Sequence, residues 1–453
     1  MLVLKKVGLI SLGCAKNQVD SEVMLGHLKS HNYQLTEDNY QADALIVNTC
    51  GFIEDAKEES IEAILKASRY KEVGECDVII VCGCLSQRYE SMLKEEMPEI
   101  DVLLGTDQWD KIGETLDKFF AGKEVKDDFS RKTDMYSHDD PRLSIDYSDY
   151  RGSAYIKIAE GCDNHCSFCA IPSIRGGFRS RSIDSIKKEA TKLASVGVRE
   201  INLIAQDTTR YGLDIYDEYK LSELLEELTT IPEITWIRFL YGHPSRIDDK
   251  LINTVSAKNK ICPYVDLPLQ HINEKVLKRM NRGGSKPEIK QLLQKLRANI
   301  PDIVIRTSFM VGFPGETEEE FNELLDFIQE MKFDQAGIFK YSKEENTKAY
   351  EYKDEVDEEE KEKRYIEATK LQQEIMKEKR SKWIGKTFKV LIDEELEDEP
   401  GTYLGRTKYQ APEVDGSVII SDSNLDEGNF VSVKITQILE NDLIGEIDYE
   451  FSK

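Results

Sequence analysis

Residues 154–170 read AYIKIAEGCDNHCSFCA, a strand-like apolar run that leads directly into Cys162, Cys166 and Cys169. The spacing C-x3-C-x2-C offers three thiolates from one loop, whereas a structural zinc site closes its tetrahedron with four ligands. A fourth zinc ligand could still come from His165 or from a distant cysteine. The preferred alternative is a [4Fe–4S] cluster held by three thiolates, with one iron left open for a cofactor or substrate.

The same strand-then-loop pattern begins with this stretch and recurs after it. Its strand-like runs, separated by helical patterns, are YIKIAE, EINLIA, TWIRFLY, YVDLPL, IVIRTSFMV and FDQAGIFKY. Six such units predict a partial (βα)6, TIM-like barrel, in which function lies on the loops that follow the strands. The three-cysteine loop occupies that position after the first strand.

Upstream, residues 1–120 show a second series of alternating strand-like and helical patterns, which predicts an N-terminal parallel α/β domain. Its strand-like runs end at Cys14, Cys50 and Cys84, so all three cysteines should meet at the carboxyl edge of one sheet. A second three-cysteine cluster is the preferred interpretation, and buried thiol packing is the alternative. Cys82 would point to the same face of its strand as Cys84 and could compete with it. We take Cys82 as strand interior.

The remaining segments have distinct compositions. Residues 121–150 are polar and without periodicity, which predicts a linker. The barrel and the charge-dense helix that follows it are assigned to 151–380. Residues 383–453 contain short, glycine-punctuated, β-branched runs that predict a small antiparallel β-barrel. The expected fold class is thus α/β multidomain.

Composition narrows the class of protein. Nine cysteines, an odd number, and the lack of an export-like leader disfavour a disulfide framework, so we expect a cytoplasmic protein with no membrane segment. The formal net charge of −25 over 453 residues argues against a protein that finds nucleic acid through a broad basic field.

The three-cysteine loop at the start of a βα-barrel pattern resembles the radical S-adenosylmethionine superfamily. That resemblance implies that Cys162, Cys166 and Cys169 hold a [4Fe–4S] cluster whose open iron binds S-adenosylmethionine. One electron from a cellular donor would then cleave S-adenosylmethionine to a 5′-deoxyadenosyl radical, which takes hydrogen from an unactivated C–H bond.

Over essentially its whole length the chain resembles the methylthiotransferase family, most closely its ribosomal-protein branch of the RimO type. The phrases that carry the resemblance are SLGCAKNQVDSE, VNTCGFIEDAKEESI, GCLSQRY, CSFCAIPSIRG, LIAQDTTRYG, DLPLQHINEKVLKRMNR and VGFPGETEEEF. It implies transfer of a methylthio group to the β-carbon of an aspartate in small-subunit ribosomal protein twelve. An auxiliary [4Fe–4S] cluster on Cys14, Cys50 and Cys84 would carry the sulfur, and a second S-adenosylmethionine would supply the methyl group.

Further candidate residues follow the later strands. The loop GFPGE runs from Gly312 through Gly315 to Glu316 and precedes a capping-box pattern; its backbone amides could face an anionic cofactor, or it could be a plain turn. Four strand-end residues are candidate contacts to S-adenosylmethionine or substrate, with structural hydrogen bonding as the alternative: Gln206, Asp207, Gln270 and His271. One arginine of the run Arg175, Arg179 and Arg181 is hypothesised to read the target carboxylate.

The C-terminal segment resembles the TRAM domain, generally an RNA-binding module, but its charge points elsewhere. Residues 383–453 contain six Lys and Arg against 16 Asp and Glu, which would repel phosphate backbones and attract a basic ribosomal protein. Nucleic acid is therefore not the expected substrate. A tRNA methylthiotransferase remains the first alternative, and a non-catalytic metal-binding or electron-carrier protein is the alternative from another class.

Overall fold

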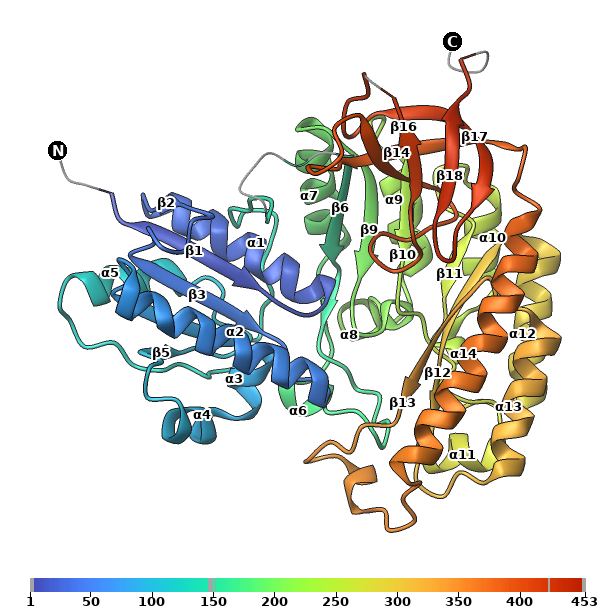
Figure 1. Ribbon diagram of the computed structural model, residues 1–453, viewed down its shortest axis with the longest axis horizontal. Coiled ribbons are helices and arrows are strands. Elements are labelled where there is room, and N and C mark those ends of the chain that lie inside the picture. The colour runs from blue at the N-terminus through green and yellow to red at the C-terminus, as the bar shows by residue number, and fades with distance from the viewer. Residues whose placement is uncertain (1–3, 146–149, 151, 423, 450–453) are drawn as a thin grey trace. The chain divides into compact units, whose positions relative to one another are not determined.

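The computed structural model describes residues 4–145, 150, 152–422 and 424–449 (Figure 1). The chain divides into two compact units. The first comprises Met1–Asp149, Lys157–Glu189 and Glu344–Thr347; the second comprises Tyr150–Ile156, Ala190–Lys343 and Lys348–Lys453. The loop with Cys162, Cys166 and Cys169 therefore belongs to the same unit as the N-terminal domain.

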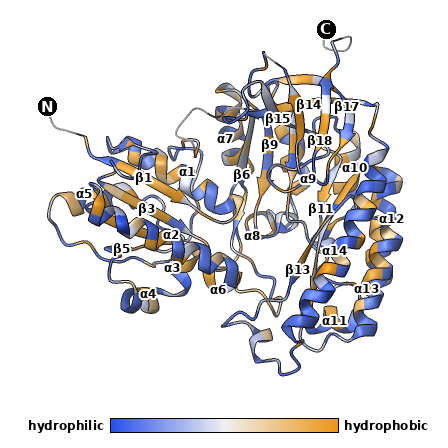
Figure 2. Ribbon diagram, in the orientation of Figure 1, coloured by the Kyte–Doolittle hydropathy of each residue, from blue (hydrophilic) through white to orange (hydrophobic). Residues whose placement is uncertain are grey.

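The N-terminal domain is built on a five-stranded parallel sheet. Its spatial order is β2 (Gln34–Leu35), β1 (Lys6–Ser11), β3 (Ala44–Thr49), β4 (Val78–Gly83) and β5 (Val102–Leu103). The accompanying helices are α1 (Ala15–Ser30), α2 (Glu54–Val73), α3 (Cys84–Arg88), α4 (Glu90–Glu96) and α5 (Ile112–Phe120). Strand residues pack on one face against α1 and α5, and on the other against α2 and α4. Burial of both faces explains why these strands read as continuous apolar runs, drawn orange in Figure 2.

The central strands confirm the predicted partial barrel. One sheet has the order β10 (Trp236–Phe239), β9 (Val198–Ile204), β6 (Gly152–Lys157), and a second has the order β11 (Tyr264–Asp266), β12 (Val304–Val311), β13 (Gln335–Lys340). A parallel bridge from Ile237 in β10 to Ile261 continues toward β11. The helices between these strands are α7 (Ile183–Ser195), α8 (Leu213–Tyr216), α9 (Leu221–Thr229), α10 (Asp249–Ala257), α11 (Glu274–Arg279), α12 (Lys286–Asn299) and α13 (Glu318–Met331).

The C-terminal segment forms the predicted small closed barrel. Its strands, in spatial order, are β14 (Thr387–Glu395), β15 (Thr402–Thr407), β16 (Val418–Ser421), β18 (Leu443–Ile447) and β17 (Phe430–Ile438). The pairs are antiparallel except β16 with β18, which run parallel. Two contacts join this barrel to the central strands. The rings of Trp236 and Phe430 pack edge to face with their centroids 4.7 Å apart, and Nη2 of Arg406 lies 2.8 Å from Oε2 of Glu200.

Two connecting segments complete the chain. The described part of 121–150 contains no helix, yet it is anchored: Arg142 pairs with Glu22 of α1 at 2.5 Å and with Glu189 at 2.5 Å. After β13 the chain forms the single long helix α14 (Glu358–Ser381) that its charge pattern predicts. Among the described residues no helix is long and apolar enough to cross a membrane.

Candidate functional site

The first three cysteines lie where predicted, at the carboxyl ends of three adjacent strands. Cys14 precedes α1 after β1, Cys50 directly follows β3, and Cys84 is the first residue of α3 after β4. Because β1, β3 and β4 are neighbours in a parallel sheet, their ends place the three residues at one edge. Cys82 instead packs in the apolar core beneath them, with its sulfur 3.9 Å from that of Met24.

The loops that carry these cysteines are in close contact. A Cβ added to Gly13, whose φ is +88°, would lie 2.7 Å from Cβ and 3.0 Å from Sγ of Cys50. A Cβ on Gly51 would lie 2.7 Å from Cα of Leu85, the residue after Cys84. Glycine at both positions therefore lets the three loops approach one another.

A residue that the sequence analysis did not single out, Asn17, ties these loops together. Its Nδ2 donates to the carbonyl oxygens of Leu12 at 2.9 Å and Thr49 at 2.8 Å. Leu12 lies two residues before Cys14, and Thr49 directly precedes Cys50. Its Oδ1 accepts from Sγ of Cys84 at 3.8 Å and from the guanidinium of Arg175. Its position three residues after Cys14, on the first turn of α1, was the only sequence signal for this role.

Arg175 belongs to α6 (Ile171–Arg175), the short helix that follows the second cysteine set. Its Nη1 donates to Asp20 at 3.0 Å and to both carboxylate oxygens of Glu160, at 3.1 and 3.0 Å. Lys157 pairs with the same two acids, and all four side chains are at most 6% exposed. Two buried cations thus neutralise two buried carboxylates beside Asn17, as burial of charge requires.

The electrostatic environment distinguishes the three N-terminal thiols, which are all free. Burial, with a smaller contribution from Cys84, raises the pKa of Cys50 to about 12, and burial raises the pKa of Cys84. Desolvation also opposes ionisation of Cys14, but the charges of Lys16 and Arg175 outweigh it and lower its pKa. The positive charge of Arg175 favours the thiolate form of all three.

The second cysteine set occupies the loop after β7 (Ala159–Glu160), which pairs with β8 (Arg179–Ser180). Gly161, at φ +75°, allows the loop to turn, because a Cβ there would lie 2.1 Å from the carbonyl oxygen of Gly177. The backbone N–H of Asn164 donates to Sγ of Cys162 at 3.4 Å, the kind of N–H···S bond that stabilises a cluster thiolate.

The two cysteine sets are neighbours within one unit. Cys84 forms a small apolar cluster with Ala170 and Ile174, and Ala170 is the residue directly after Cys169. No three Cys, His, Asp or Glu side chains in the described chain converge closely enough to hold a single metal ion. The thiolates of a [4Fe–4S] cluster bind different irons, so each set fits such a cluster by its donor chemistry without meeting at one point.

The predicted strand-end residues of the second unit are mostly engaged in structural bonds. Asp207 is buried, pairs with Arg246 and accepts from Oγ1 of Thr209 at 2.7 Å. Gln206 lies beside it and is half-buried. Gln270 has a left-handed backbone, at φ +70°; its N–H donates to the carbonyl of Ser308 and its carbonyl accepts from the N–H of Met310, both in β12. A non-glycine residue held in this conformation is a feature of functional sites.

His271 and the GFPGE loop form one buried network. Nε2 of His271 lies 3.1 Å from Oε1 of Glu316, whose other oxygen accepts from the N–H of Gly312 and pairs with Arg364 at 3.2 Å. The N–H of Gly315 donates to the carbonyl of Asp354. Both glycine amides thus already bind acceptors of this chain, while the predicted capping box of α13, Thr317 with Glu320, is present.

The arginine run is not a solvated face. Arg175 and Arg181 are buried, and Arg181 pairs with Glu189 at 2.5 Å. Arg179 pairs with Asp107 at 3.0 Å. Each guanidinium already has a carboxylate partner in the chain, so the structure offers no support for the hypothesis that one of them reads a substrate carboxylate.

A second set of contacts fixes the loop after Cys50. Nη1 of Arg88 donates to the carbonyl of Gly51 at 2.9 Å and pairs with Glu344 at 2.7 Å, with both charged side chains at most 3% exposed. Lys57 adds a contact to Glu344 at 3.3 Å. Glu344 belongs to the four-residue segment Glu344–Thr347 that joins the first unit, a placement that no sequence pattern indicated.

Three family models match separate parts of the chain: uncharacterized protein family UPF0004 over residues 6–105, the radical SAM superfamily over 156–328, and the TRAM domain over 384–447. Among solved structures, the radical S-adenosylmethionine methyltransferase TsrM from Kitasatospora setae is similar in fold. Its TM-score is 0.55 at 15% identity, covering 74% of this chain and 72% of that one.

Curated relatives are far more similar in sequence. A protein named ribosomal protein uS12 methylthiotransferase RimO from Natranaerobius thermophilus is 54% identical over 448 residues, covering 99% of this chain and 100% of its own. A relative of the same name from Desulforamulus reducens is 52% identical, covering 97% of this chain and 99% of its own. The chain therefore belongs to the RimO family of methylthiotransferases, within the radical SAM superfamily.

Proposed function

We propose that this protein transfers a methylthio group to the β-carbon of an aspartate in ribosomal protein uS12. The observation that carries the proposal is the presence of two three-cysteine sets in one compact unit, brought together by the contact of Cys84 with α6. The names of relatives that align over nearly the whole chain supply the substrate.

The proposal includes two [4Fe–4S] clusters. Cys162, Cys166 and Cys169 hold one, and the set after β1, β3 and β4 holds an auxiliary one, consistent with the free thiols and the nearby cation. When bound, a cluster with an open iron and S-adenosylmethionine supplies the one-electron chemistry that activates a C–H bond. The protein itself positions the thiolates, neutralises their charge through Arg175 and excludes bulk water from the carboxylates beside them.

Each predicted domain has its own role in the proposed function. Residues 1–120 present the auxiliary site, 121–150 connect, 151–380 form the radical SAM barrel with its helix, and 383–453 form the TRAM-like barrel. All four strand-end candidates, Gln206, Asp207, Gln270 and His271, stay predicted contacts to the cofactor or substrate. The Asp207 carboxylate and the His271 ring are bonded within the chain, and Nε2 of Gln270 donates to Oγ of Ser308 at 3.5 Å. The reaction further requires a cellular electron donor and, we propose, takes place in the cytoplasm.

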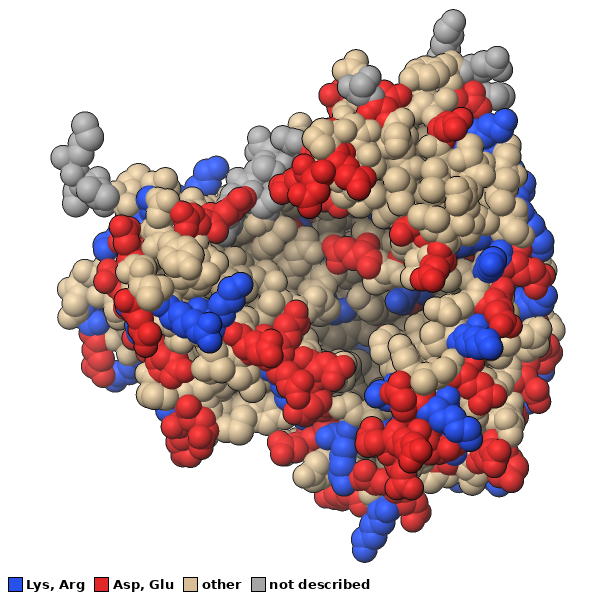
Figure 3. All heavy atoms as spheres, in the orientation of Figure 1, with Lys and Arg blue, Asp and Glu red and all other residues tan. Residues whose placement is uncertain are grey.

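Charge supports a basic protein as substrate. Figure 3 shows acidic side chains spread over much of the face that it draws. On the C-terminal barrel, basic side chains are fewer than acidic ones on this face. The segment 383–453 contains 16 Asp and Glu against six Lys and Arg. Such a surface favours encounter with a positively charged ribosomal protein and disfavours a phosphate backbone.

The first test offers uS12 and bulk tRNA separately to anaerobically reconstituted protein with S-adenosylmethionine and a reductant, read by mass spectrometry. A methylthio mass increase on an aspartate of uS12 is the expected result. Modification of tRNA alone would leave the chemistry intact and make the substrate assignment wrong.

A second test counts iron. Full reconstitution should give about eight irons per chain, and alanine at Cys14, Cys50 and Cys84 together should halve it. Cys76→Ala is the matched control, since Cys76 is buried before the amino end of β4 and belongs to neither set. Zinc in place of iron and sulfide would overturn the two-cluster proposal and favour a non-catalytic metal protein.

A further inference from the structure

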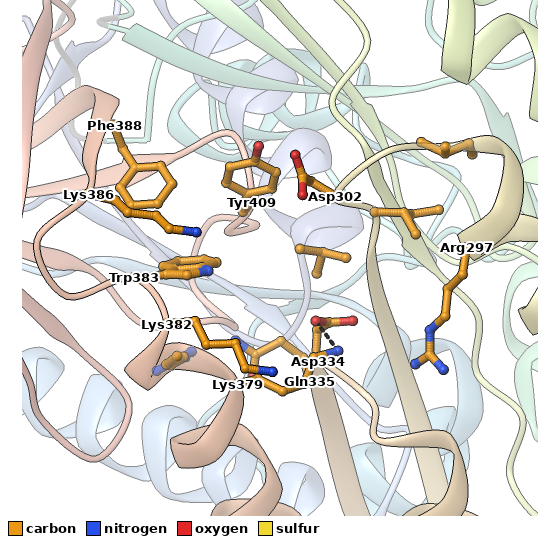
Figure 4. Close-up of a pocket in the computed structure, with 14 residues that line it drawn as sticks. Arg297, Asp302, Asp334, Gln335, Lys379, Lys382, Trp383, Lys386, Phe388 and Tyr409 are labelled. Atoms are coloured by element: carbon orange, nitrogen blue, oxygen red, sulfur yellow. Dashed lines mark ion pairs between the residues drawn. The ribbon is translucent and has the colours of Figure 1, made fainter.

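A cavity of about 480 Å³ lies within the second unit, and none of the residues proposed to act in methylthio transfer lines it. It is bounded by the end of α12, the first residues of β12 and β13, the end of α14, the start of β14 and Tyr409 (Figure 4). Val304 at its wall is the first residue of β12, whereas Gly312 follows the last. Eight residues of strand separate the cavity from the carboxyl ends by roughly 25 Å.

The charge of this cavity is opposite to that of the chain. Its lining includes five cations and two acids, in a protein of net charge −25. The cations are Arg297, Lys379, Arg380, Lys382 and Lys386, and the acids are Asp302 and Asp334. A local excess of positive charge in an acidic protein predicts an anionic occupant.

Three of the cations are fixed in the wall. Lys379 pairs with Asp334, marked by a dashed line in Figure 4. Arg297 donates to the carbonyl of Lys332 at 3.0 Å, and Arg380 donates to the carbonyl of Asp415 at 2.9 Å. By contrast, within the described residues neither Lys382 nor Lys386 makes a salt bridge, and both side chains are exposed. These two ammonium groups are the ones available to an incoming anion.

An aromatic cluster stands beside the two lysines. Trp383 lies 5.2 Å from Phe388 and 5.7 Å from Tyr409, measured between ring centroids, and all three rings are only partly buried. Figure 4 shows Trp383 between the side chains of Lys382 and Lys386. A partly exposed aromatic face next to free ammonium groups matches a planar aromatic ligand that also carries negative charge.

We propose that this cavity binds a free nucleotide, its base stacked on the Trp383 cluster and its phosphate held by Lys382 and Lys386. The volume is in the range of small-molecule sites and accommodates a mononucleotide. A longer RNA is disfavoured because the acidic surface of residues 383–453 repels further phosphates. The proposal is independent of methylthio transfer.

The test titrates guanosine 5′-monophosphate into the reconstituted full-length protein by calorimetry; its base differs from the adenosine part of S-adenosylmethionine. We expect a dissociation constant below about 1 mM, and at least about tenfold weaker binding of guanosine and of inorganic phosphate. Lys382→Ala with Lys386→Ala should weaken binding about tenfold or more. Lys370→Ala, a matched exposed lysine of α14 outside the cavity, should leave it unchanged.

Three results would overturn the proposal. Absence of binding by the monophosphate excludes a nucleotide site. Unchanged affinity in the double lysine variant would place the ligand elsewhere. As a control, the urea unfolding of that variant should match that of the unchanged protein, which shows that weaker binding does not come from loss of folding. Binding of a five-residue RNA without binding of the monophosphate would make the occupant a polymer.

Discussion

Replacement of Glu200 by Gln tests how the C-terminal barrel is fastened to the central strands. Glu200 is fully buried in β9, where it pairs with Arg238 at 3.1 Å and with Arg406 of β15 at 2.8 Å. Burial alone would raise the pKa of this carboxyl, but the two guanidinium groups outweigh it and lower the pKa from 4.5 to about 2. The charged form is therefore strongly preferred in the folded protein.

The size of the effect follows from that difference. Each tenfold change in proton affinity corresponds to ~1.4 kcal/mol, so the ionised Glu200 stabilises the folded state by about 3 kcal/mol at pH 7. Because its folded pKa is lowered, the contribution is complete above pH 4.5 and is lost as the pH falls toward 2. At pH 3.5 about 2 kcal/mol should remain.

Urea unfolding followed by tryptophan fluorescence measures the effect, since Trp236 packs on Phe430 where the two parts meet. Glu200→Gln should lower the free energy of unfolding by about 3 kcal/mol at neutral pH. The difference in unfolding free energy between the variant and the unchanged protein should become smaller in acid. Glu233→Gln, an exposed glutamate, is the control. A negligible difference in unfolding free energy, or one that does not change with pH, would refute the reasoning.

Three further substitutions test the loops and caps. Gly13→Ala should lower the iron bound by protein that lacks the second cysteine set, because the new Cβ meets Cys50 and the φ of +88° is strained; unchanged iron content would argue against close approach of these loops. Glu344→Gln should destabilise the protein by about 3 kcal/mol in urea unfolding, since Arg88 loses its buried partner, and a change within error would mean that solvent replaces the pair. Thr317→Ala should cost about 1 kcal/mol in the same assay through loss of the capping box, with Thr317→Ser as the conservative control that retains it.

Local patterns were sufficient to predict the elements. The six central strands, the parallel N-terminal sheet, the long helix α14 and the C-terminal closed barrel all lie where apolar periodicity and turn residues indicated. The spacing of apolar residues indicates whether one face or both faces of an element are buried. The carboxyl ends of neighbouring parallel strands lie at the same edge of their sheet. The clustering of Cys14, Cys50 and Cys84 therefore followed from chain spacing alone.

Local patterns were insufficient for the polar face of α1. Lys16, Asn17, Asp20 and Glu22 would be read as solvated, yet all four are buried. Their partners come from distant positions in the chain, as when Asp20 meets Arg175 at 3.0 Å. A charge loses its hydration on burial, and only a partner supplied by tertiary folding offsets that loss.

By itself, then, the sequence determined which elements form, which residues offer sulfur, and which family the motifs resemble. Only the tertiary structure decided that Cys84 packs against Ala170 and Ile174, that Arg175 is buried against Asp20 and Glu160, and that basic and aromatic residues meet in the cavity beside β14. The physical reason is the range of the interactions. Periodicity and turn propensity act between near neighbours in the chain, whereas charge pairing and cavity shape depend on residues that only the fold brings together.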